Sequence, residues 1–259
     1  MNGRRTTRLL TILAVASLLL LAAAPLVYAD GTWTNQPRAS PSARYGHAMA
    51  SLGGDQVLLF GGYGGSLNGD TWVYDFSANT WTNKAPAPAP SARYSHAIAY
   101  LGGDQVLLFG GRDGSYYGDT WVYDLSDNTW TEQAPAAAAA NGAPLPFGSG
   151  THAALYDGPP ARYGHAMAPL GGDQVLLFGG GGTSNLLGDT WVYDLSDNTW
   201  TRQALRAGPS PRVSSAMAYL CGDQVLLFGG ELTSGRNGET WVYDLGANTW
   251  TDLTGATIP

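Results

Sequence analysis

The segment Asp104-Gln-Val-Leu-Leu-Phe-Gly-Gly111 decides the fold, because the same eight residues occur four times in the chain. The copies begin at Asp55, Asp104, Asp173 and Asp223. Each copy has a run of apolar residues, Val-Leu-Leu-Phe, between polar residues and a glycine pair, which predicts a short strand that is covered on both faces. Such a strand must lie between two neighbouring sheets.

Two further motifs follow each copy, so the repeating unit is about fifty residues long. Thr-Trp-Val-Tyr-Asp begins at Thr71, Thr120, Thr190 and Thr240, and Asn-Thr-Trp-Thr begins at Asn79, Asn128, Asn198 and Asn248. In the second unit we expect strand a at Tyr94–Leu101, strand b at Gln105–Phe109, strand c at Thr120–Leu125 and strand d at Thr129–Glu132. Every unit therefore predicts one antiparallel sheet of four strands.

The nine tryptophans all lie in the strand c and strand d motifs. Because one sheet cannot cover its own apolar faces, these side chains are expected to pack between neighbouring sheets. Stacking of the tryptophans on a carbohydrate is the alternative interpretation.

The combination of Arg-Tyr-x-His, Phe-Gly-Gly, Trp-Val-Tyr-Asp and Asn-Thr-Trp-Thr resembles the kelch repeat over residues 32–251. The resemblance implies an all-β fold, a propeller of four-stranded antiparallel blades around a central channel with strand a innermost. The domain is expected over residues 30–259, with repeats at about 44–82, 93–131, 162–201 and 212–251.

The repeat pattern departs from the family in two places. An extra strand d motif, Thr32-Trp33-Thr34, precedes the first complete unit, so four sets of strands a, b and c accompany five strands d. Three arrangements are open: a four-bladed ring with a spare strand, which we favour, an open row of blades completed by a second copy in a homodimer, or an incomplete coding sequence. The other departure is an insertion at 136–160, which is rich in Ala, Gly and Pro and predicts a long surface loop.

The N-terminus has the layout of a signal peptide over residues 1–29. Arg4 and Arg5 precede the apolar run Leu9–Val27, and the small residues of Val27-Tyr-Ala29 suit cleavage near Ala29. We expect a secreted, periplasmic or extracellular protein with no membrane span in the mature chain. An uncleaved N-terminal anchor is the alternative. The single cysteine, Cys221, leaves no internal disulfide.

Charge and motifs exclude several classes of function. The net charge of −7 becomes more negative when the signal peptide and its three arginines are removed. Nucleic acid is therefore not an expected partner, because its binding needs a basic face. Neither a Gly-x-Ser-x-Gly elbow, nor a phosphate-binding loop, nor His-Glu-x-x-His is present, and we predict no cofactor and no catalytic residue.

Strand a of each unit contributes residues that are expected to line the channel. They are Arg44, His47, Arg93, His96, Arg162, His165 and Arg212. Three histidines can ligate a metal, but a residue repeated in each unit more often serves that unit, here by hydrogen bonding between blades. We therefore predict no metal site. The motif Asp124-Leu-Ser-Asp-Asn128 and its copies predict Asx turns rather than calcium loops.

The connections between strands separate the two ends of the blades. The a–b and c–d turns are nearly the same in all units, whereas the b–c loops differ in every unit. In an antiparallel sheet the b–c loops and the d–a connections emerge at the same end, called the loop face below. Because binding sites commonly occupy variable loops on a rigid scaffold, we expect the ligand there; loop drift without function is the alternative. The candidate binding residues are Tyr63, Asn68, Arg112, Tyr116, Tyr117, Asn185, Glu231, Arg236 and Asn237.

The leading functional hypothesis is an exported binding module for a protein or glycan. The alternative, implied by the kelch resemblance, is a carbohydrate-active enzyme of the sialic acid mutarotase or galactose oxidase-like type acting at the channel mouth. The copper type needs a cysteine beside its metal, but Cys221 lies in an a–b turn, at the opposite end from the loop face. Nearly uniform repeats also disfavour catalysis, which needs different groups at different positions.

Overall fold

The computed structural model describes residues 39–134 and 158–255, in which every regular element is a β-strand. The predicted signal peptide, the motif Thr32-Trp33-Thr34 and residues 136–157 of the insertion lie outside the described residues. Within the described ranges, no apolar helix is long enough to span a membrane.

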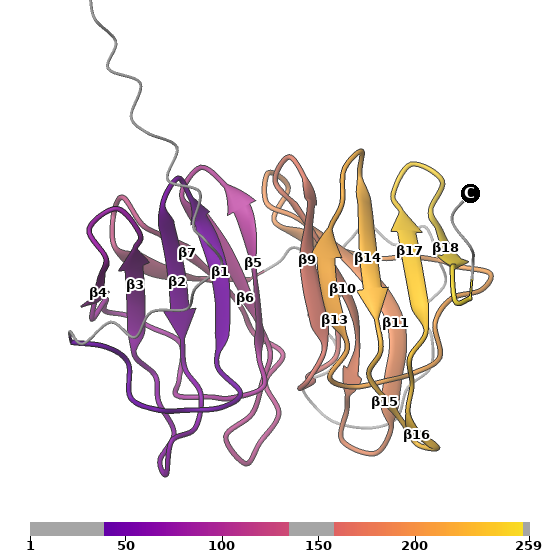
Figure 1. Ribbon diagram of the computed structural model, residues 1–259, viewed down its shortest axis with the longest axis horizontal. Coiled ribbons are helices and arrows are strands. Elements are labelled where there is room, and N and C mark those ends of the chain that lie inside the picture. Colours follow the sequence, from indigo (N-terminus) through magenta and orange to yellow (C-terminus); the bar gives the residue numbers. More distant parts are fainter. Residues whose placement is uncertain (1–38, 135–157, 256–259) are drawn as a thin grey trace, which may run out of the picture. The chain divides into compact units, whose positions relative to one another are not determined.

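The strands form four antiparallel sheets, each in chain order, which are the four predicted blades (Figure 1). Blade 1 contains β1 (Ala48–Gly53), β2 (Gln56–Phe60), β3 (Thr71–Asp75) and β4 (Thr80–Asn83). Blade 2 contains β5 (Ala97–Gly102), β6 (Gln105–Phe109), β7 (Thr120–Asp124) and β8 (Thr129–Gln133). Blade 3 contains β9 (Ala166–Gly171), β10 (Gln174–Gly181), β11 (Leu186–Asp194) and β12 (Thr199–Arg202). Blade 4 contains β13 (Ala216–Tyr219), β14 (Gln224–Phe228), β17 (Thr240–Asp244) and β18 (Thr249–Asp252), and its b–c loop forms the hairpin β15 (Glu231–Leu232) and β16 (Gly235–Arg236).

The predicted strand bounds in the second unit agree with the structure at strand b, differ by one residue at the ends of strands c and d, and differ most at strand a. Strand b is Gln105–Phe109 as predicted, but strand a begins at Ala97 instead of Tyr94. Ser95 has a φ of 56°, which an extended strand cannot contain. Tyr94 therefore pairs with Arg112 in an isolated bridge, which brings the start of strand a to the b–c loop of its own blade.

The side chains of strand b alternate between the two neighbouring blades, as its continuous apolar run predicted. In blade 2, Leu107 and Phe109 pack toward blade 3, while Val106 and Leu108 pack toward blade 1. All four are fully buried. Blades 2 and 3 thus contribute apolar side chains to the interfaces on both of their sides.

Three apolar clusters join the blades in chain order, between blades 1 and 2, 2 and 3, and 3 and 4. The innermost strands β1, β5, β9 and β13 contact one another in this order (Figure 1). Among the described residues no fourth apolar cluster joins blade 4 to blade 1, and Phe228 of blade 4 is 54% exposed. The described residues therefore do not show the closed four-bladed ring that we favoured from the sequence.

The strand d tryptophans pack between blades, as predicted. Trp130, Trp200 and Trp250 are buried. Each indole N–H donates to a threonine hydroxyl of the preceding blade, at 2.9 to 3.0 Å. A tryptophan that is buried and hydrogen-bonded in this way serves the interface between two blades.

Candidate functional site

The arginine of strand a is buried in an ion pair inside its own blade. In blade 2, the Arg93 guanidinium donates to both carboxylate oxygens of Asp119, at 2.6 and 2.8 Å, and the Trp121 indole donates to the same carboxylate at 2.8 Å. Equivalent pairs are Arg44–Asp70, Arg162–Asp189 and Arg212–Glu239. Arg93, Arg162 and Arg212 are fully buried. These guanidinium groups thus lie inside the blades instead of lining an open channel, because a buried charge needs a partner.

In blades 3 and 4 the arginine lowers the pKa of its acidic partner. Burial by itself would raise the pKa of Asp189, but the hydrogen bonds and charge of Arg162 outweigh it and lower the pKa. In blade 4, hydrogen bonds from Arg212, then from Trp241 and Asn237, lower the pKa of Glu239 to about 2. The ion pairs are therefore maintained at neutral pH.

Two of the strand a histidines pack between blades. The rings of His96 and His165 are buried and lie edge-on to Phe60 and Phe109 of the preceding blade, with ring centroids 5.5 and 5.6 Å apart. The ring nitrogens have no hydrogen-bond partner at full geometry, but the backbones of Phe60 and Phe109 in the preceding blades interact with the two rings and act to raise their pKa values. Aromatic packing therefore accompanies a weaker polar contact between blades. Burial, followed by the charge of Arg93, lowers the pKa of His96 to about 3. His47 of blade 1 is exposed, and the described residues hold no group of three side chains placed to bind a metal.

A continuous set of aromatic rings and one arginine crosses blades 1 to 3 at the loop face. This Tyr–Arg cluster consists of Tyr45, Tyr63, Tyr94, Arg112, Tyr116 and Tyr163. The Arg112 guanidinium lies over the rings of Tyr94 and Tyr163, at 4.7 and 4.3 Å from their centroids. Arg112 therefore bridges blades 2 and 3.

The tyrosines extend the cluster to either side of Arg112. Tyr116 stacks on Tyr163 with ring centroids 5.3 Å apart and ring planes 13° apart. Tyr45 contacts Tyr63 and Tyr94, with centroids 5.6 and 6.3 Å apart. Tyr45 is 63% exposed, and the other members of the cluster are partly buried. The cluster thus presents aromatic surface to solvent.

Arg112 differs from the buried arginines in having no acidic partner. Within residues 39–134 and 158–255, its guanidinium forms neither an ion pair nor a hydrogen bond, and its Nε is buried and unpaired. Cation–π contacts with the two tyrosine rings hold it in place. Its positive charge is therefore available to an external acceptor.

A family model described as the KLHDC2/KLHL20/DRC7 Kelch-repeats domain matches this chain over residues 28–158 and 151–259. The chain belongs to the kelch-repeat family. Kelch domains generally mediate protein binding. A comparison with curated proteins finds no match.

Three of the predicted loop-face residues close the b–c loops of their kelch blades. The backbone N–H groups of Asn68, Tyr117 and Asn237 donate to the carbonyls of Gly62, Gly111 and Gly230, each at 2.9 Å. The Tyr117 hydroxyl also donates to Asp113 at 2.6 Å, and its ring lies 4.0 Å from the Arg93 guanidinium. These contacts give the three residues a role in loop structure, and their part in binding stays a prediction.

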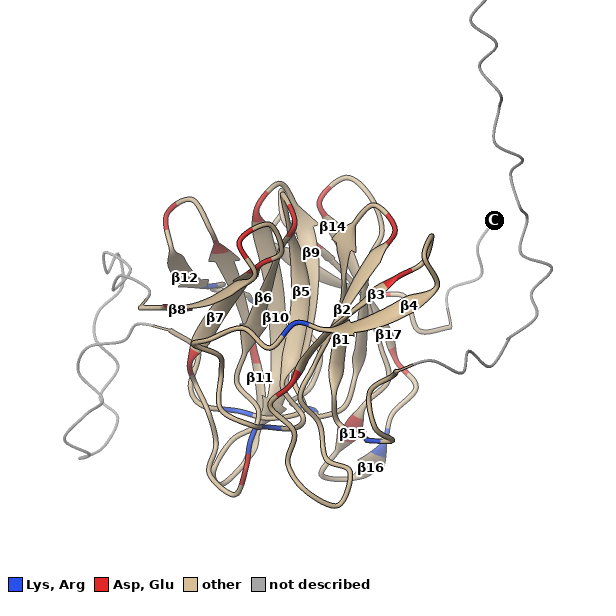
Figure 2. Cartoon of the chain, turned by 90° about the vertical axis from the view of Figure 1, so that its left-hand side faces the viewer, with Lys and Arg blue, Asp and Glu red and all other residues tan. Residues whose placement is uncertain are grey.

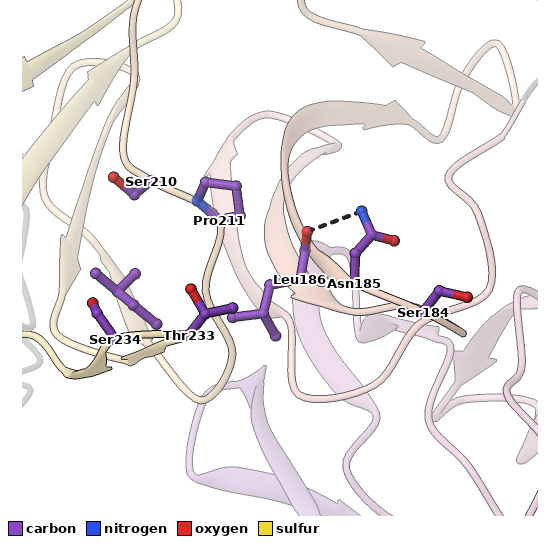
Figure 3. A pocket seen from close by; sticks show the side chains of 8 residues that line it. Ser184, Asn185, Leu186, Ser210, Pro211, Thr233 and Ser234 are labelled. Atoms are coloured by element: carbon purple, nitrogen blue, oxygen red, sulfur yellow. Dashed lines mark hydrogen bonds between the residues drawn. The ribbon is translucent and has the colours of Figure 1, made fainter.

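The other predicted binding residues lie on the loops of blades 3 and 4. Asn185 donates to the carbonyl of Leu186 at 3.3 Å, while Glu231 and Arg236 pair across the exposed β15–β16 hairpin. Between these loops is a depression of about 470 Å³ (Figure 3). Its lining residues are Ser184, Asn185, Leu186, Ser210, Pro211, Leu232, Thr233 and Ser234. The depression has no charged side chain in its lining, unlike the Tyr–Arg cluster.

Sequence reasoning missed the strand a tyrosines and the acidic partners of the buried arginines. Tyr45, Tyr94 and Tyr163 occupy one repeat position that holds Val213 in blade 4. The change from tyrosine to valine in the fourth unit was the signal in the sequence that the tyrosines form a cluster confined to blades 1 to 3. The signal for the acids was Gly-Asp-Thr-Trp, or Gly-Glu-Thr-Trp in blade 4, before each strand c.

Charge is distributed unequally between the two ends of the kelch blades. Acidic residues gather at the a–b and c–d turns, whereas the loop-face end carries most arginines together with further acidic residues, among them the four partners of the buried arginines (Figure 2). Several turn acids serve the turns themselves: Asp124 accepts from the N–H groups of Ser126 and Asp127 at 2.9 and 3.2 Å. These bonds are those of the predicted Asx turn. The paired acids neutralise four of the arginines, so the positive charge that a ligand can meet at the loop face is that of Arg112 and Arg236, neither of which has an ion pair in the described residues.

Proposed function

We propose that this kelch protein is an exported binding module that holds a protein or glycan ligand on its loop face. The Tyr–Arg cluster carries the proposal. Tyrosine and arginine dominate the binding energy of many interfaces, because each combines a large contact area with specific hydrogen bonds. Arg112 is already held between two rings and has no acidic partner in the described residues. A ligand therefore meets a positioned cation without having to displace an internal ion pair.

The surroundings of the cluster support this location. The cluster is formed by residues from three consecutive blades, so its rings are supported by a rigid sheet framework. The exposed Arg236 adds a second cation at the same end of the blades. The acidic turns at the other end disfavour an anionic ligand there.

No specific observation favours the enzymatic alternative. Arg93 and Arg162, which an enzyme of that kind would use at the channel mouth, are fully buried and paired with Asp119 and Asp189. A catalytic role would require these ion pairs to open.

The binding proposal is tested with an array of immobilised glycans and a displayed peptide library, each screened against the full chain and against Arg112→Ala. Ligands that use the cluster should bind Arg112→Ala about tenfold or more weakly, because truncation of a central binding residue costs about 2 kcal/mol. Tyr219→Ala is the matched control, since Tyr219 is a 44% exposed tyrosine at the a–b turn of blade 4. Ligands that lose affinity with Tyr219→Ala but not with Arg112→Ala would contradict the proposal.

Export is supported by the N-terminal sequence alone. If residues 1–29 direct export, the chain recovered outside the cytoplasm begins at Asp30, which mass spectrometry of the intact protein measures. An intact N-terminus on a membrane-bound chain would instead support the uncleaved anchor.

A further inference from the structure

The outer side of blade 4 carries the residues that blade 3 uses to bind blade 4. We call the side of a blade that faces the next blade in the chain its forward face, and the other side its backward face. On blade 3 the forward residues Phe178 and Leu170 are fully buried against blade 4. The same residues at the same repeat positions of blade 4, Phe228 and Leu220, are 54% and 45% exposed. The forward face of blade 4 thus has the residues of an interface between blades, but no further blade covers it in the described residues.

The backward face of blade 1 has the complementary property. Met167 of blade 3 is buried between blades, whereas the equivalent Met49 of blade 1 is 47% exposed. Leu125 of blade 2 packs into the cluster between blades 1 and 2, but Phe76, which takes its position in blade 1, is 69% exposed. Blade 1 therefore presents the surface that blades 2 to 4 use to bind the blade before them.

Polar groups on these two end faces are also complementary. In the three internal interfaces, a strand d indole donates to a strand c threonine of the preceding blade. Among the described residues, this series leaves the Trp81 indole N–H of blade 1 without an acceptor and the Thr240 hydroxyl of blade 4 without an indole donor. The donor without an acceptor and the acceptor without a donor therefore lie on opposite end faces of the same chain.

The backbone repeats this pattern. Gly62, Gly111 and Gly180 each donate an N–H to the carbonyl of the next blade's arginine, at 2.8 Å. The equivalent Gly230 of blade 4 has no such acceptor in the described residues, and the carbonyl of Arg44 in blade 1 has no such donor. One contact between blade 4 and blade 1 would satisfy these groups with the geometry already present three times.

We propose that the forward face of blade 4 packs against the backward face of blade 1 of a second copy of this chain. The contact is heterologous, because two different surfaces meet, and such contacts close into a ring when the rotation allows it. Two copies supply eight blades, which lies within the range that propellers adopt. The two-chain ring therefore has two identical end contacts and no exposed end face.

A second copy fits these faces better than an unrelated partner does. Every blade 4 residue that takes part is identical to its blade 3 equivalent: Ala218, Leu220, Leu226, Phe228, Thr240 and Val242 match Ala168, Leu170, Leu176, Phe178, Thr190 and Val192. Every copy of the chain carries both faces, so the binding partner is always present at the same concentration. Burial of this apolar surface supplies the driving force.

The first test is the mass in solution. Light scattering coupled to size exclusion should report twice the mass of one chain, the latter taken from mass spectrometry. Phe228→Asp should reduce the mass to that of one chain, because an unpaired charge would be buried in the contact. Tyr219→Asp is the matched control and should keep the two-chain mass, since the Tyr219 hydroxyl lies beside Gly171 of blade 3, on the side away from the end face. Circular dichroism of both variants reports whether the blades are folded.

The second test distinguishes a head-to-tail contact from other dimers. Phe228→Lys disables only the blade 4 face and Met49→Asp only the blade 1 face, so each variant alone should be a single chain. Mixed, the two variants retain one intact contact, and a tagged Phe228→Lys chain should retain untagged Met49→Asp chain.

Three outcomes overturn the proposal. A single-chain mass for the unaltered protein would mean that the end faces are covered within one chain or stay exposed. An open polymer that grows with concentration would exclude the closed ring. A Met49→Asp chain that stays dimeric would mean that blade 4 pairs with itself.

Discussion

The interior of each blade and the loop face use arginine and tyrosine in opposite ways. Arg162 is fully buried and held by both oxygens of Asp189, and this pairing recurs in all four blades with an Asp or Glu. Arg112 occurs at one blade only and lies between two tyrosine rings without an acidic partner in the described residues. Residues that repeat thus hold the fold, and a residue that occurs once is free to serve a ligand. Four substitutions test this comparison.

Arg162→Ala should have the largest effect on the free energy of unfolding. Removing the guanidinium leaves Asp189 with its charge and few partners in a mostly buried site, which costs about 3–5 kcal/mol. Chemical denaturation followed by tryptophan fluorescence measures the loss. The double variant Arg162→Met, Asp189→Leu removes both charges and should be less destabilised than Arg162→Ala. A loss below about 1 kcal/mol for Arg162→Ala would show that the pair does not support the blade.

Trp200→Phe should cost about 2–3 kcal/mol, because it removes the bond to the Thr120 hydroxyl and leaves that buried group unpaired. Trp81 is the matched position in blade 1, where the indole is only partly buried and has no threonine partner in the described residues. In the Phe228→Asp background, where the proposed contact with a second copy is broken, Trp81→Phe should cost about 1 kcal/mol or less under the same denaturation conditions. Equal losses at the two positions in that background would mean that the end face of blade 1 is covered within one chain as well as an internal interface is.

The buried histidines should make the fold sensitive to mild acid. The pKa of His96 is lowered to about 3 in the folded chain, so the unfolded chain takes up a proton first as the pH falls below 6.5. Stability is therefore complete above pH 6.5 and decreases as the pH falls toward 3, by about 1–2 kcal/mol between pH 6.5 and 5 for this group.

His96→Ser, which places in blade 2 the residue that blade 4 has as Ser215, tests this origin. The melting temperature of the variant should change less between pH 6.5 and 5 than that of the unaltered chain. The lowered pKa values of Asp189 and Glu239 keep their ion pairs with arginine intact over this interval. An unchanged pH profile in the variant would assign the acid sensitivity to other groups.

Arg112→Ala should have the smallest effect on stability. A partly exposed cation–π contact contributes about 0.5–1 kcal/mol, and Arg112 has two. The same denaturation experiment should therefore report a loss of about 1 kcal/mol, well below that of Arg162→Ala. A loss as large as that of Arg162→Ala would make Arg112 part of the framework and would remove the contrast on which the binding proposal rests.

The sequence by itself determined the features that depend on neighbours along the chain. Strand b was predicted to the residue in the second unit, because a continuous apolar run bounded by an Asp-Gln pair and a Gly-Gly pair leaves little freedom for its ends. The Asx turns of the Asp124 type and the packing role of the strand d tryptophans followed from motifs that occur in every unit. Each of these predictions rests on a motif that occurs in all four units.

Only the tertiary structure decided which distant residues meet. The partner of Arg162 is 27 positions away in Asp189, and Arg112 lies between tyrosines of two different blades. The exposure of Phe228 beside the burial of the identical Phe178 is the clearest case, because the same residue in the same motif has opposite surroundings. Local sequence sets the conformation of a blade, but burial depends on whether another blade lies against it, and that is a property of the assembled chain.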